Sequence, residues 1–131
     1  MISLVVEDDF TSRVVMQRLL LPYGECHVAV DGKEAITAYQ TMLEAGSKYD
    51  LICLDIMMPE MDGQEVLTEI RKMEETKGIL HPEAAKIIMT TALADPKNVM
   101  QAFKGQCEAY LVKPFRKDKL MEILHDLGLI T

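Results

Sequence analysis

Five short apolar runs, each followed by a segment with apolar residues at helical spacing, constrain the fold of this chain more than any other feature. The runs lie at residues 2–6, 27–30, 51–54, 86–90 and 109–112. Strict alternation of strands and helices predicts an α/β fold, in which a doubly wound, five-stranded parallel sheet is covered by helices on both faces. The runs are apolar throughout rather than at every second position, as expected for strands buried on both sides.

Turn and capping residues indicate where the helices between these strands begin and end. Asp9 can cap the helix after the first run, and Asp31, which precedes a glycine, begins the second. Gly63 opens the third helix. A fourth is expected over residues 95–105, which start with a capping Asp-Pro pair and end in glycine. The last helix ends at Gly128.

The size and charge of the chain limit its class. Its 131 residues are expected to form a single domain over residues 1–131, and a net charge of −7 argues against a nucleic-acid-binding surface, which needs clustered Lys and Arg. No apolar run reaches the length of a transmembrane helix, and the N-terminus lacks the pattern of a signal peptide. We therefore expect a cytoplasmic location, with no direct nucleic-acid or membrane partner.

Charged and hydroxyl side chains stand at the carboxyl ends of four of the five predicted strands. They are Glu7, Asp8, Asp9, Asp55, Thr90, Thr91 and Lys113. Because ligands of open parallel sheets bind at the carboxyl ends of the strands, these groups are expected to converge on one region. Each has an ordinary explanation when taken alone, as a helix cap, a strand-end hydroxyl or a solvated turn. Their joint occurrence at four strand ends favours a common chemistry.

That chemistry is best explained as phosphoryl transfer. Crowded carboxylates with an open side suit a hard divalent cation, and Mg²⁺ fits best because it accepts a few carboxylates and keeps several waters. A cation, a lysine and a hydroxyl are also the groups that neutralise and hold a transferring phosphoryl group. Asp55 can supply the attacking oxygen, because a carboxylate that acts as a nucleophile forms an aspartyl-phosphate.

Four segments carry a resemblance to a known family. They are "LVVEDD", "LDIMMPEMDG", "IIMTTALA" and "AYLVKPF", in this order along the chain. With them the sequence resembles the receiver domain of two-component response regulators, including the chemotaxis regulators, over essentially its full length. The resemblance implies a flavodoxin-like sheet with the strand order 2-1-3-4-5, which the apolar runs alone do not reveal.

The resemblance also implies roles for individual residues around the acids. Asp55 corresponds to the phosphoacceptor. Asp8 would bind Mg²⁺ directly and Glu7 mainly through water, with Asp55 and the backbone carbonyl of Met57 completing the protein ligands. Asp9 is expected to cap the first helix rather than bind the metal.

Further roles fall at the ends of the last two strands. Thr91 resembles the switch hydroxyl that bonds the phosphoryl group, in preference to the threonine before it, because a small residue should follow. Lys113 resembles the family's invariant lysine, with a cis bond expected to Pro114. Tyr110 resembles the switch aromatic that turns inward once Thr91 moves.

These roles imply a signalling module rather than an enzyme that turns over an external substrate. A sensor histidine kinase or a phosphotransfer protein would phosphorylate Asp55. Movement of Thr91 and Tyr110 would then change the surface of the fourth helix, fifth strand and fifth helix, which an unknown downstream protein partner would read.

Two other functions fit the sequence less well than a receiver domain does. A phosphatase of the haloacid dehalogenase type also forms an aspartyl-phosphate, but it needs a second acid two residues after the nucleophile, where this chain has Met57. A degenerate receiver that serves only as a scaffold would normally have lost an acid, the hydroxyl or the lysine, and none of these is missing.

Two features set the chain apart within the resemblance. Residues 72–85, "KMEETKGILHPEAA", form a longer connection than is usual, and an extended third helix followed by a surface loop is expected there. The two side chains that flank the path of the hydrolytic water in the family correspond to Met57 and Leu93. Neither can hydrogen-bond a water, so slow loss of the phosphoryl group is expected.

Overall fold

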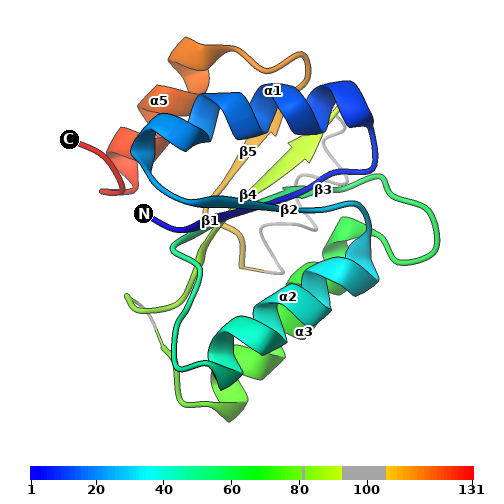
Figure 1. Cartoon of the computed structure of the whole chain (residues 1–131), viewed down its shortest axis with the longest axis vertical. Helices are drawn as coiled ribbons and strands as arrows, with labels where there is room; N and C mark the ends of the chain where they lie inside the picture. The colour runs from blue at the N-terminus through cyan, green and yellow to red at the C-terminus, as the bar shows by residue number, and fades with distance from the viewer. Residues whose placement is uncertain (81, 93–105) are drawn as a thin grey trace.

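Five parallel strands form the sheet at the centre of the computed structural model, which describes residues 1–80, 82–92 and 106–131 (Figure 1). The strands are β1 (Ser3–Val6), β2 (Cys26–Ala29), β3 (Leu51–Asp55), β4 (Lys86–Thr91) and β5 (Ala109–Val112). They lie in the order β2-β1-β3-β4-β5, and each neighbouring pair is parallel. The predicted fold class and strand order are confirmed, and every strand end lies within one residue of its predicted position.

Helices cover both faces of this sheet. The described helices are α1 (Phe10–Leu20) with a short 3-10 helix after it, η1 (Leu21–Tyr23), then α2 (Gly32–Glu44), α3 (Gly63–Thr76) and α5 (Lys117–Asp126). α1 and α5 lie on one face and α2 and α3 on the other, as Figure 1 shows. The fourth helix, predicted over residues 95–105, lies outside the described residues.

The three central strands, β1, β3 and β4, are apolar between their ends because successive side chains enter two different cores. In β1, Leu4 and Val6 belong to the core that α2 and α3 complete, whereas Val5 belongs to the core that α1 and α5 complete. All three side chains are at most 2% exposed. Burial on both faces therefore leaves polar groups in these three strands only near their ends, and the candidate site lies at their carboxyl ends.

Three of the helices begin at an aspartate that satisfies their free backbone N–H groups. Asp9 caps α1, Asp31 caps α2 and Asp62 caps α3, each accepting a hydrogen bond from the N–H three residues later at 2.9–3.0 Å. The predicted cap at Asp9 is thus confirmed. Its carboxylate accepts a hydrogen bond from the first turn of α1, as expected for a helix cap.

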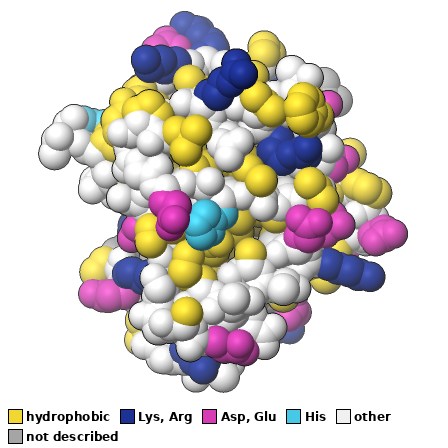
Figure 2. Space-filling model, in the orientation of Figure 1, with side chains coloured by type: hydrophobic (Ala, Val, Ile, Leu, Met, Phe, Trp, Pro, Cys, Tyr) yellow, Lys and Arg dark blue, Asp and Glu magenta, His cyan; other side chains and the backbone are white. Residues whose placement is uncertain are grey.

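The long connection before β4 has the predicted form. α3 continues to Thr76, and residues 77–80 and 82–85, the described part of the connection, lie outside helices and strands and include turns. Of the helices that the structure describes, none has both the length and the apolar character needed to cross a membrane. Figure 2 shows basic and acidic side chains scattered among apolar ones over one face of the molecule, instead of a patch of a single sign.

Candidate functional site

Three acids meet where β1 and β3 end. Glu7 and Asp8 follow β1, Asp55 is the last residue of β3, and the two strands are neighbours in the sheet. Each acid offers a carboxylate oxygen within 4.8 Å of the others. Glu7 and Asp55 are each only 2% exposed, whereas Asp8 faces solvent. A set of oxygen ligands with one open side fits the requirements of a hard divalent cation.

Lys113 enters the same site from the end of β5. Its Nζ lies 2.5 Å from Glu7 Oε1 and 3.5 Å from Asp55 Oδ2, and its side chain is 17% exposed. Its backbone N–H donates to the carbonyl of Thr91 at 2.8 Å, which continues the pairing of β5 with β4 beyond the strand itself. The predicted cis bond between Lys113 and Pro114 is present. The sheet therefore brings the ammonium to the acids, as its parallel topology requires.

The loop after β3 folds tightly around Asp55. The N–H of Met57 donates to Asp55 Oδ1 at 3.2 Å, and Gly63 N–H donates to the carbonyl of Ile56 at 3.0 Å. A Cβ at position 63 would stand only 2.2 Å from the Asp55 carbonyl oxygen. Only glycine therefore allows the start of α3 to come this close. Met57 itself is 65% exposed beside the site.

Burial and the neighbouring Glu7 change the protonation of Asp55. Burial is the largest cause, and the hydrogen bond and charge of Glu7 add to it, so that the pKa of Asp55 rises to about 7 although Lys113 opposes the shift. Burial alone would lower the pKa of Lys113, but the hydrogen bond with Glu7 and the charge of Asp55 raise it overall. The site thus carries more negative charge than its one ammonium neutralises.

The two threonines at the end of β4 occupy different positions relative to Asp55. Thr90 is the cross-strand partner of Asp55, and Thr91 lies one residue further, opposite Val112. Both threonines are 2% exposed. Tyr110, the residue expected to act as an aromatic switch, is 42% exposed in β5.

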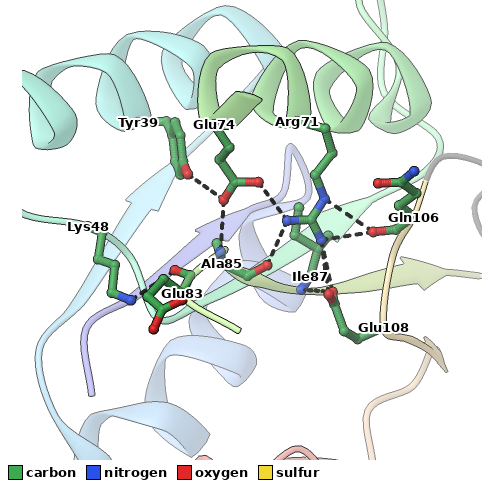
Figure 3. Close-up of polar contacts among 9 residues, drawn as sticks. All are labelled: Tyr39, Lys48, Arg71, Glu74, Glu83, Ala85, Ile87, Gln106 and Glu108. Carbon is green, nitrogen blue, oxygen red and sulfur yellow. Dashed lines mark hydrogen bonds and ion pairs between the residues drawn. The ribbon is translucent and has the colours of Figure 1, made fainter. Parts of the chain in front are cut away.

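A second cluster of charges, not predicted from the sequence, lies at the opposite end of the sheet, where β4 and β5 begin. It contains Arg71, Glu74 and Glu108 (Figure 3). A signal was present in the sequence: Glu74 follows Leu67 by seven residues and Ile70 by four, so it falls on the buried face of α3. A carboxylate on the apolar face of a helix requires partners.

Comparisons with known proteins agree with this geometry. The family described as "Response regulator receiver domain" matches residues 3–125. Regulatory protein VanRB from Enterococcus faecalis is 34% identical over 121 residues, covering 92% of this chain and 49% of VanRB. Chemotaxis protein CheY from Thermotoga maritima is 29% identical over 127 residues, covering 95% of each protein. The chain thus spans about half the length of the first relative and nearly all of the second.

A solved structure shows the same fold. The receiver domain of the histidine kinase CKI1 from Arabidopsis thaliana, in complex with Mg²⁺ and BeF₃⁻, has a TM-score of 0.82 to this chain and 29% sequence identity. The match covers 97% of this chain and 89% of that one.

Proposed function

Because the chain belongs to the response regulator receiver domain family, and is thus a receiver domain of two-component systems, we propose that Asp55 accepts a phosphoryl group from the phosphohistidine of a sensor histidine kinase or of a phosphotransfer protein. The observation that carries the proposal is a buried carboxylate at a strand end with the Lys113 ammonium 3.5 Å away and two further acids beside it. A carboxylate nucleophile next to a fixed cation is suited to phosphoryl transfer.

The residues of the site divide the chemistry between them. A carboxylate oxygen of Asp55 forms the new bond to phosphorus, while the bond from phosphorus to the histidine nitrogen breaks and its electron pair returns to the imidazole. Lys113 balances charge on the phosphoryl oxygens, and the Thr91 hydroxyl donates a hydrogen bond to one of them. The protein turns over no external substrate in this role; it assists its own phosphorylation and dephosphorylation.

The acids are proposed to hold Mg²⁺. Glu7, Asp8 and Asp55 would be the side-chain ligands, with the carbonyl of Met57 as a further one. When bound, the ion supplies positive charge next to the phosphoryl oxygens. The close approach of three carboxylates supports this assignment, as does the Mg²⁺ complex of the related CKI1 receiver domain.

The output is proposed to be a change in the surface around β5. Thr91 and Tyr110 would move together after phosphorylation, because they lie on the neighbouring strands β4 and β5, where Tyr110 pairs with Met89, two residues before Thr91. A groove of about 480 Å³ between β5 and α5, lined by residues that include Tyr110, Val112, Lys119 and Ile123, supports the proposal that a protein partner reads this surface.

Replacing Asp55 tests the proposed acceptor. Asp55→Asn is expected to take up no phosphoryl group from acetyl phosphate in the presence of Mg²⁺, whereas Asp62→Asn, which alters the other aspartate of the same loop, is expected to be phosphorylated like the wild type. Lys113→Ala should keep some phosphorylation and lose the conformational response. Intact-mass spectrometry and amide NMR shifts report these outcomes. A phosphorylated Asp55→Asn protein at full intensity would refute the assignment.

Mg²⁺ is expected to raise the melting temperature, because it binds the native state and relieves the repulsion among the acids. Asp8→Ala should stabilise the metal-free protein and abolish the response to Mg²⁺. Thermal melts with and without millimolar Mg²⁺ measure both effects, with KCl of equal ionic strength as the control for screening. A wild-type melting temperature that does not respond to Mg²⁺ would contradict the site.

A further inference from the structure

Arg71 joins three separate parts of the chain where β4 and β5 begin, at the end of the sheet opposite the acidic site (Figure 3). Its Nη1 donates to Glu74 Oε1 at 2.8 Å and to the Ala85 carbonyl at 2.9 Å. Its Nη2 donates to the Gln106 carbonyl at 2.8 Å and to Glu108 Oε2 at 3.0 Å. One guanidinium thus binds two carboxylates and two backbone carbonyls, and its side chain is 15% exposed.

The two glutamates extend these contacts to the starts of β4 and β5. Glu74 Oε2 accepts from Tyr39 Oη at 2.6 Å and from the N–H of Ala85 at 2.8 Å. Glu108 Oε2 accepts from the N–H of Ile87 at 2.6 Å. We call Tyr39, Arg71, Glu74 and Glu108 the Arg71 cluster.

The cluster fixes β5 to β4 at the point where β5 begins. Glu108 contacts Ile87 twice, because its backbone N–H donates to the Ile87 carbonyl at 2.9 Å while its side chain accepts from the Ile87 N–H. The preceding Gln106 has a φ of 68°, in the left-handed region, and Arg71 holds its carbonyl. Arg71 therefore binds the backbone turn that leads into β5.

A short strand connects this anchor to the acidic site. β5 has four residues, and Lys113 follows it directly. A strand rises about 3.3 Å per residue, and the backbone from Glu108 to Lys113 is continuous and pairs with β4 at both ends, so a slip of β5 along β4 would carry Lys113 with it. The Lys113 ammonium lies 2.5 Å from Glu7 and 3.5 Å from Asp55, so a small displacement alters both contacts.

We propose that Arg71 is a positioning residue for phosphoryl transfer: by holding the start of β5 to α3 and β4, it places Lys113 and Tyr110 relative to Asp55. The inference rests on the proposed function of Asp55. A purely stabilising role does not require these residues, since a buried ion pair contributes little compared with apolar side chains of the same size. The arrangement instead uses the planar fork of arginine, which lysine cannot reproduce.

Arg71→Lys tests the proposal, because it keeps the charge but cannot bind all four acceptors. Misplacement of a catalytic group by about 1 Å costs up to ~100-fold in rate, and we expect phosphorylation by saturating acetyl phosphate and Mg²⁺ to slow about tenfold. The amide NMR signals of Lys113 and Tyr110 in the unphosphorylated protein are expected to shift. Arg18→Lys, the same exchange at an exposed position of α1, should change neither readout.

Glu108→Gln tests the same route from the other side. It keeps one oxygen acceptor for Arg71 or Ile87 but removes the charge, and it should slow phosphorylation and shift the same amide signals. Because both changes act through the start of β5, the double variant Arg71→Lys/Glu108→Gln should be no slower than the slower single variant. Rates that multiply would show that the two residues act independently, which contradicts the proposal.

Two outcomes separate this inference from the proposed function. If the folded Arg71→Lys protein matches Arg18→Lys in phosphorylation rate and in the Lys113 signal, while only its stability to urea falls, Arg71 has a structural role alone and the inference is wrong. If the wild type takes up no phosphoryl group at Asp55, the proposed function fails. The amide shifts of Lys113 and Tyr110 then still decide whether Arg71 positions β5.

Discussion

Glu74→Ala is expected to lower the free energy of unfolding by about 3–5 kcal/mol, the usual cost of removing one partner from a buried ion pair. The Glu74 side chain is only 3% exposed, and its oxygens accept from Arg71, Tyr39 and the N–H of Ala85. Removal of the carboxylate leaves two buried donors unsatisfied and places Arg71 beside an empty space.

Urea denaturation of Glu74→Ala measures this loss, and the neighbouring residue provides a matched control. Glu75 is exposed on the same turn of α3, so Glu75→Ala should change the free energy of unfolding by about 0.5 kcal/mol or less. Glu74→Gln keeps an acceptor for Tyr39 and should lose less than the alanine variant. Equal stabilities for the two alanine variants would show that the buried carboxylate has no structural role.

Met57→Asn is expected to shorten the lifetime of phosphorylated Asp55 by roughly ten- to a hundred-fold, because a polar group that orients a nucleophile is commonly worth about 1–3 kcal/mol. Met57 is well placed for this effect. Its N–H donates to Asp55 Oδ1, and its side chain is 65% exposed beside the site. A methionine there would shade a phosphoryl group on Asp55 without orienting a water.

The decay of phosphoprotein after removal of the donor measures this lifetime. Met57→Leu, which keeps an apolar side chain of similar size, should decay like the wild type. Leu93, the second predicted flanking residue, lies outside the described residues, and Leu93→Glu should act in the same direction. If the double variant Met57→Asn/Leu93→Glu decays no faster than the wild type, the prediction that these two side chains set the lifetime is wrong. A slow decay would suit a sustained response or a relay.

The strands and the acidic site were predictable to different extents. Apolar runs located all five strands, and in the three central strands burial on both faces leaves few polar residues between the strand ends. The five runs are similar in composition, so the sequence of a run does not show which strands lie next to it in the sheet. The placement of Asp55 beside Glu7 depends on β3 pairing with β1, and only the family resemblance supplied that order.

The Arg71 cluster was not predicted, for a physical reason. Its contacts join residues far apart in sequence, such as Tyr39 with Glu74 at a separation of 35 and Arg71 with Glu108 at 37. Charged residues on a helix are most often solvated, and their partners become visible only when the strands are placed. The position of Glu74 on the apolar face of α3 was the one local indication.

α3 touches both ends of the sheet. At its first residue, Gly63 packs against the backbone of Asp55 so closely that no side chain fits between them. Eight residues later, Arg71 holds the starts of β4 and β5. A helix rises 1.5 Å per residue, so these two contacts lie about 12 Å apart along a rod that resists compression. The length of α3 between Gly63 and Arg71 therefore sets the distance between Asp55 and the start of β5. A residue inserted or deleted between Gly63 and Arg71 would change that distance, so that the contacts at the two ends of the sheet could not both form.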